Sequence, residues 1–70
     1  MSCQIVFKNG EAITVSEFKC IKAPKNNGDM KEFKQEDIEK LNLLDNVTYT
    51  VIGKTIAKIK GEQILYLILK

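Results

Sequence analysis

Residues 47–70 read VTYTVIGKTIAKIKGEQILYLILK and contain the longest apolar run of the chain, ILYLIL at residues 64–69. Gly53 and Gly61 divide this stretch into three short segments that are rich in apolar residues. Short apolar segments separated by glycine are typical of strands joined by turns. We therefore expect three consecutive antiparallel strands here, with the rest of the chain packing on their sheet or extending it.

The two glycine-centred breaks predict how these strands pair. Gly61-Glu62, with glycine first, is typical of a type II′ turn and would pair Ile59 with Ile64. An odd-length loop at Gly53 then gathers the core residues on one face: Val47, Tyr49, Val51, Ala57, Ile59, Ile64, Tyr66 and Ile68. The opposite face is polar at one end, where it carries Thr48, Thr50, Lys58, Lys60 and Gln63.

The other end of that face is apolar and is a candidate partner interface, made of Ile52, Ile56, Leu65, Leu67 and Leu69. Monomeric proteins rarely leave so many large aliphatic side chains exposed in one patch. Either the helix or the first hairpin of the same chain covers them, or a protein partner or a second copy does. A further possibility is that the final strand lies at a sheet edge, where Lys70 is its only guarding charge.

The first segment, CQIVFKNGEAITVS at residues 3–16, predicts a β-hairpin because Asn-Gly lies between alternating apolar runs. A three-residue loop over residues 8–10, with Gly10 left-handed, pairs Ile5 with Ile13 and Cys3 with Val15. This register places most apolar side chains of the hairpin on one face, namely Cys3, Ile5, Phe7, Ile13 and Val15. A slip of one residue would mix the two faces, so we favour this register.

The middle of the chain predicts a bent strand, a short strand and a helix. The alternation breaks at Ser16-Glu17, so we expect a bulge or bend there that lets one strand serve two sheets before it ends at Ala23-Pro24. Residues 25–29 predict an exposed loop, and residues 30–34 a returning strand anchored by Met30 and Phe33. Residues 35–44 are the helix candidate, with apolar residues at helical spacing: Ile38, Leu41 and Leu44.

These elements predict one β-rich α+β domain covering residues 1–70, in the order ββ(β)αβββ. We expect a small five-stranded antiparallel bent sheet or partly open barrel with one short helix. The alternative is a single antiparallel sheet with the helix on one face. A core of this size leaves stability marginal, and oligomerisation is the supplement that the composition leaves open.

The composition narrows the compartment and the chemistry. Two cysteines and no histidine cannot supply a zinc site of the usual type within one chain, so we expect no metal and no cofactor. We expect Cys3 and Cys20 to be small buried residues rather than a disulfide or a nucleophile, since the chain lacks a histidine base. The isolated cysteines, with neither a signal peptide nor a membrane-spanning run, favour the cytoplasm.

Lysine supplies all eleven basic residues and the net charge is +2. Lys54, Lys58 and Lys60 cluster around one predicted hairpin and are a candidate nucleic-acid patch. A solvated face that keeps an apolar strand soluble is the alternative interpretation. The acidic residues Glu36, Asp37 and Glu39 fit a helix N-terminus better than a catalytic or calcium site.

No residue pattern indicates catalysis. We expect a small intracellular accessory or regulatory module that binds a protein partner and itself, as a homo-oligomer such as a homodimer, and not an enzyme. The alternative is a nucleic-acid-binding small β-barrel that uses the lysine patch. The short chain, the abundance of Lys and Ile and the opening hairpin with FKNG resemble small orphan proteins of phages and mobile elements in AT-rich bacteria. This resemblance implies no residue roles.

Overall fold

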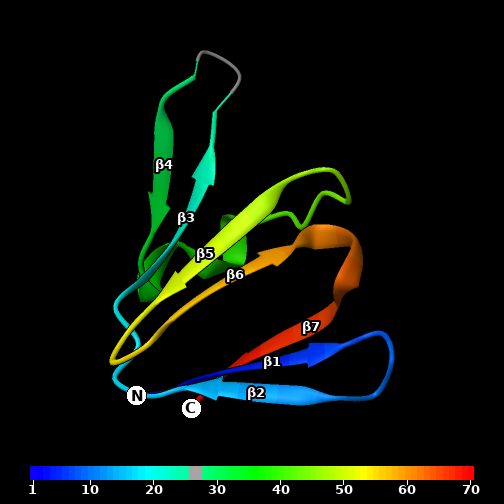
Figure 1. Cartoon of the computed structure of the whole chain (residues 1–70). Helices are drawn as coiled ribbons and strands as arrows, with labels where there is room; N and C mark the ends of the chain where they lie inside the picture. The colour runs from blue at the N-terminus through cyan, green and yellow to red at the C-terminus, as the bar shows by residue number, and fades with distance from the viewer. Residues whose placement is uncertain (26–27) are drawn as a thin grey trace.

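A computed structural model describes residues 1–25 and 28–70, and in this part of the chain seven strands form two antiparallel sheets (Figure 1). The three-stranded sheet has the order β2-β1-β7, with β1 (Cys3–Phe7), β2 (Ala12–Val15) and β7 (Ile64–Leu69). The four-stranded sheet has the order β4-β3-β5-β6, with β3 (Cys20–Pro24), β4 (Met30–Phe33), β5 (Thr48–Ile52) and β6 (Ile56–Lys60). Two short 3₁₀ helices complete the fold: η1 (Gln35–Lys40) and η2 (Gly61–Gln63). The fold is therefore β-rich, as predicted, but it is not a single five-stranded sheet.

The first hairpin has the predicted register. Ile5 pairs with Ile13 and Cys3 with Val15, and Gly10 has a φ of 91°, in the left-handed region. The turn is closed by the Gly10 N–H, which donates to the Phe7 carbonyl at 3.0 Å. Ile13 is nevertheless exposed, because β2 is an edge strand of its sheet.

The predicted bend carries the chain from one sheet to the other. β2 ends at Val15 in the three-stranded sheet and β3 begins at Cys20 in the four-stranded sheet, with Glu17 between them at a φ of 53°. β3 ends at Pro24 and β4 returns beside it, both as predicted. Of the loop predicted at residues 25–29, Asn26 and Asn27 lie outside the described residues.

The two apolar anchors predicted for β4 differ in outcome. Phe33 is buried, but the side chain of Met30 is 54% exposed. Strand alternation explains the difference. Phe33 pairs with the buried Ile21, whereas Met30 pairs with the exposed Pro24. The predicted anchoring role of Met30 is therefore wrong.

The pairing of the last third of the chain differs most from the prediction. β5 and β6 form a hairpin whose loop has three residues, since Ile52 pairs with Ile56, and this agrees with the odd-length loop expected at Gly53. Residues Gly61–Gln63 form a 3₁₀ turn instead of a type II′ turn, and β7 leaves β6 to pair with β1. This pairing satisfies the backbone hydrogen-bonding groups of β1 that β2 leaves open. The prediction of three consecutive strands in one sheet is therefore wrong, as is the pairing of Ile59 with Ile64.

A β-bulge in β7 reverses which side chains face the core. Val6 pairs with Tyr66 and Phe7 pairs with Ile64, so Leu65 is the extra residue. Ile64 is buried, and after the bulge the inward positions are Leu67 and Leu69, which pack against the core. Tyr66 is 47% exposed, and Ile68 pairs with Gln4, which alternates with the fully buried Cys3 and Ile5. The predicted core positions of Tyr66 and Ile68 are wrong for this reason.

The predicted helix is shorter and tighter than expected. η1 covers residues 35–40 as a 3₁₀ helix, and the backbone turns to an extended conformation at Leu41 (φ −79°, ψ 123°). Ile38 and Leu41 are partly buried against the core, as expected, but Leu44 is 56% exposed. Asp37 accepts a hydrogen bond from the Lys34 N–H at 3.3 Å, so one acidic residue of the first turn caps it.

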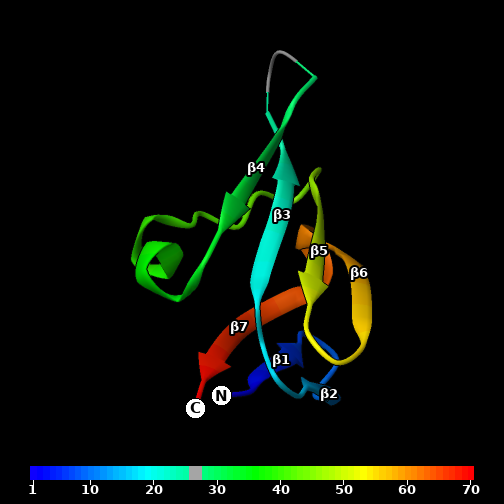
Figure 2. The ribbon, with the colours of Figure 1, turned by 90° about the vertical axis from the view of Figure 1, so that its left-hand side faces the viewer.

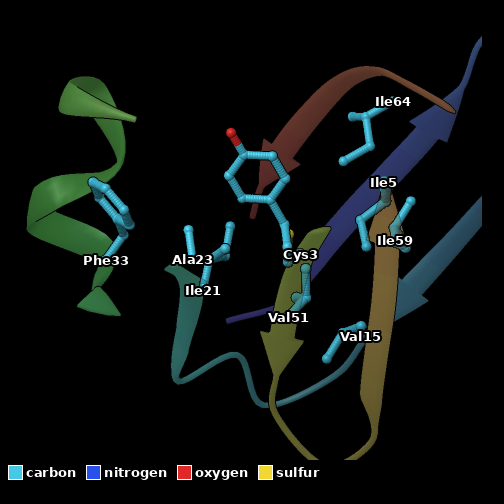
Figure 3. Packing of buried hydrophobic residues seen from close by; sticks show 10 residues of the cluster. Cys3, Ile5, Val15, Ile21, Ala23, Phe33, Val51, Ile59 and Ile64 are labelled. Atoms are coloured by element: carbon cyan, nitrogen blue, oxygen red, sulfur yellow. The ribbon is translucent and has the colours of Figure 1, made fainter. Parts of the chain in front are cut away.

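The core lies between the two sheets (Figure 3). Its buried residues come from both: Cys3, Ile5, Val15 and Ile64 from the three-stranded sheet, and Ile21, Ala23, Phe33, Tyr49, Val51 and Ile59 from the four-stranded sheet. Cys3 and Cys20 are buried and free, which confirms the prediction that they are small buried residues. Across residues 1–25 and 28–70, no helix has the length and apolar character needed to cross a membrane.

Candidate interaction surfaces

The five residues of the predicted partner interface do not form one patch. Ile52 and Ile56 are cross-strand partners in the four-stranded sheet, where Ile56 is 66% exposed. Leu65, Leu67 and Leu69 belong to β7 in the other sheet. Of these three, only Leu65 at the bulge is highly exposed, at 56%. The premise that all five share one sheet face is therefore wrong, because β7 does not follow β6 in the same sheet.

β7 has a free edge. Ser2 and Lys70 exchange two backbone hydrogen bonds of 2.9 Å, which continue the β1–β7 ladder. Backbone groups alternate in direction along an antiparallel ladder, so those of Leu67 and Leu69 point away from β1. No second strand pairs with β7 among the described residues. The edge position that the sequence suggested is confirmed.

The outer face of the three-stranded sheet adjoins this edge and carries no charged side chain on its strands. Ala12, Val6 and Tyr66 form one row across β2, β1 and β7. Thr14, Gln4 and Ile68 form the next row. The sequence prediction missed this surface because it depends on the pairing of β1 with β7, which brings the two ends of the chain together (Figure 1).

The outer face of the four-stranded sheet is rich in lysine. Glu32 pairs with Lys22, Lys22 with Thr50 and Thr50 with Lys58, so these four side chains form a row that holds two lysines and one carboxylate. Lys60 lies two residues beyond Lys58 and forms an ion pair of 3.6 Å with Glu62. Lys54 is exposed in the β5–β6 turn, outside the row. Two of the three lysines in the predicted nucleic-acid patch therefore share a face, and Lys22 joins them because β3 pairs with β5.

A groove lies between the β3–β4 hairpin and the connection from η1 to β5. Figure 2 shows the course of this connection past β4. Its volume is about 250 Å³. Buried side chains from the inner face of the four-stranded sheet form its floor: Ala23, Phe33 and Tyr49. Three lysines line it at the rim: Lys25, Lys31 and Lys40. No Asp or Glu is among the described residues that line it.

Tyr49 holds the connection that forms one wall of the groove. Its hydroxyl donates to the Asn42 carbonyl and accepts from the Leu44 N–H, both at 2.8 Å. The Gly61 N–H donates to the Val47 carbonyl at 2.8 Å and ties the same connection to η2. The connection from η1 to β5 is therefore fixed at both ends despite its irregular backbone.

A second hollow, of about 420 Å³, lies where the first hairpin loop meets η2. Its charged lining residues are Lys8, Glu11 and Glu62. Burial raises the pKa of the Cys3 thiol, and burial together with the nearby Glu32 carboxylate raises that of Cys20. Both thiols are therefore less nucleophilic at neutral pH than an exposed cysteine. The described residues contain no cluster of three or more His, Cys, Asp or Glu side chains that could hold a metal ion.

Comparisons with known proteins give no further guide to function: no protein-family model, no curated protein and no solved structure matches the chain.

Proposed function

We propose that the chain is a non-catalytic interaction module of the cytoplasm that self-associates through the free edge of β7. The observation that carries the proposal is the nature of this edge. β7 is the longest strand in the described part of the chain, at six residues, and all six are apolar or aromatic. Edge strands of stable monomers are usually short or guarded by charges, because an open edge pairs with another chain.

Two copies of β7 can pair antiparallel about a two-fold axis. Such pairing is isologous, so each copy uses the same backbone groups, those of Leu67 and Leu69. It would extend the two three-stranded sheets into one continuous sheet and join their uncharged outer faces. A 70-residue domain has a small core, and this burial would add to it. The two free, buried cysteines support a reducing compartment.

A charge at the bulge of β7 tests the proposal. We expect Leu65→Glu and Tyr66→Glu to raise the dimer dissociation constant at least about tenfold, because each removes apolar surface and places a charge where the joined sheets would exclude water. Both side chains are about half exposed, so each variant should fold. Sedimentation equilibrium over a wide concentration range measures the effect.

Met30→Glu is the matched control, since Met30 is equally exposed but lies on β4, at an edge of the other sheet. It should leave the dimer unchanged. A wild-type chain that stays monomeric up to millimolar concentration contradicts the proposal. Equal weakening by Met30→Glu would place the contact elsewhere.

Nucleic-acid binding through the outer face of the four-stranded sheet is the second candidate, favoured by the row that Lys22 forms with Lys58 through Thr50. If this face binds single-stranded nucleic acid, affinity should fall with salt, and each lysine changed to Gln should lower the slope of log K against log salt by about 0.7. Lys22→Gln and Lys58→Gln test this in a mobility-shift titration, with Lys70→Gln as the control. Absence of any shift at low salt rules this candidate out.

A further inference from the structure

The groove beside the β3–β4 hairpin combines an apolar floor with a basic rim. Ala23, Phe33 and Tyr49 are at most 7% exposed as whole residues, yet they line this groove. The Tyr49 hydroxyl is occupied by its two hydrogen bonds to the η1–β5 connection, so the ring carbons are what Tyr49 offers to the groove. Leu44 is part of the wall of the groove, and this residue is 56% exposed. An apolar group bound in this groove would therefore be shielded from water.

The charge around this floor has one sign. Lys25 and Lys31 come from the hairpin and Lys40 from the last turn of η1. The ammonium of Lys31 lies 5.0 Å from the centre of the Phe33 ring, in a cation–π contact that holds a positive charge close to the floor. No carboxylate is among the described lining residues to balance these lysines. The complement of this groove is an apolar side chain flanked by negative charges.

The size of the groove distinguishes between classes of ligand. Pockets for small molecules and cofactors usually enclose about 300–1,000 Å³. A groove of about 250 Å³ lies below that range and is the size of one or two apolar side chains. A nucleobase would need a widely exposed aromatic face on which to stack, and the aromatic residues in the described lining, Phe33 and Tyr49, are at most 7% exposed.

We propose that this groove binds an acidic segment of a partner protein, with one large apolar side chain in the groove against Leu44 and the edge of the floor, and flanking carboxylates at Lys25, Lys31 and Lys40. The inference goes beyond self-association, because the groove is built on the four-stranded sheet and β7 lies in the other. A module that pairs through β7 would thus present one such groove on each copy.

An NMR titration of the ¹⁵N-labelled full chain tests the proposal. The probe is an acetylated peptide of Glu and Asp with a central Leu-Phe pair, and the reference peptide has the same charges around Ala-Ala. We expect amide shifts centred on Lys31, Phe33, Leu41 and Leu44, and about tenfold tighter binding of the Leu-Phe peptide. Equal affinity for both peptides, or shifts centred on Lys22 and Lys58, would overturn the proposal.

Paired variants separate the groove from general attraction to a basic chain. Lys31→Gln with Lys40→Gln should weaken binding about fivefold, whereas Lys58→Gln with Lys60→Gln removes the same charge from the other face and should leave it unchanged. All four side chains are exposed, so both variants should fold. The same titration on Leu65→Glu should give the wild-type affinity, which keeps this test independent of the dimer. Displacement of the peptide from the groove by an equimolar oligo-dT would indicate a nucleic-acid ligand and contradict the proposal.

Discussion

Replacing Gly61 by alanine is expected to lower the free energy of unfolding by about 3 kcal/mol, because the added methyl has no space. A β-carbon at Gly61 would overlap the carbonyl oxygen of Leu44, and it would lie 2.8 Å from the Leu44 carbonyl carbon and 3.1 Å from Cε2 of Tyr49. The backbone of Leu44 cannot easily retreat, since its N–H is bonded to the Tyr49 hydroxyl. For a domain of this size the loss corresponds to a fall in Tm of about 12 °C or more.

Gly10→Ala is the control for this prediction. Gly10 has a φ of 91°, but a β-carbon there would meet no atom within 4 Å, so only backbone strain of about 1 kcal/mol is expected. Gly61 is not among the residues with positive φ, so strain of this kind does not contribute to its effect. Urea unfolding at one fixed protein concentration compares the two variants. If Gly61→Ala costs no more than Gly10→Ala, the close packing of η2 on the η1–β5 connection is contradicted.

The parts of the fold that the sequence predicts are those set by neighbours in the chain. Parity of apolar residues around Asn9-Gly10 fixed the first hairpin to the correct register, and the break in alternation at Ser16-Glu17 located the passage between sheets. The odd length of the loop between Ile52 and Ile56 was predicted in the same way. In each case a slip would have moved apolar side chains to the wrong face, so local information was sufficient.

The destination of β7 is not set by its neighbours. A strand after a short turn usually pairs with the strand before it, and that rule placed β7 beside β6. The actual partner, β1, lies at the other end of the sequence. The bulge at Leu65 also exchanges the inward and outward residues of β7, and no feature of the sequence ILYLIL predicts a bulge. Both errors trace to one long-range pairing.

The candidate surfaces were hard to predict for the same reason, because they also depend on pairing between distant strands. The sequence indicated part of the lysine-rich face, because Lys58 and Lys60 lie on the same strand. Lys22 joins them only through the pairing of β3 with β5. The groove could not be predicted, since its floor and rim come from four separate elements and from the connection that Tyr49 holds.

Gly53→Ala is expected to be as damaging as Gly61→Ala, at about 3 kcal/mol, because Gly53 meets the bend between the sheets. A β-carbon there would lie 2.5 Å from the Ser16 carbonyl oxygen, 2.7 Å from Cγ1 of Val15 and 2.9 Å from the Glu17 carbonyl oxygen. The Lys54 N–H donates to the Ser16 carbonyl at 2.8 Å, so the β5–β6 turn is bonded to the bend it touches. Moving the turn away would break that bond.

The matched control is Gly28→Ala, where φ is 89° and no atom of residues 1–25 or 28–70 is found within 4 Å of the added carbon. We expect it to cost about 1 kcal/mol, from strain alone. The two glycines that divide residues 47–70 thus have a role that turn chemistry does not explain, since each lets a turn of one segment touch the backbone of a distant one. Thermal unfolding of Gly53→Ala beside Gly28→Ala tests this role. A change in Tm for Gly53→Ala no larger than that of its control would mean that the bend and the β5–β6 turn are not in close contact.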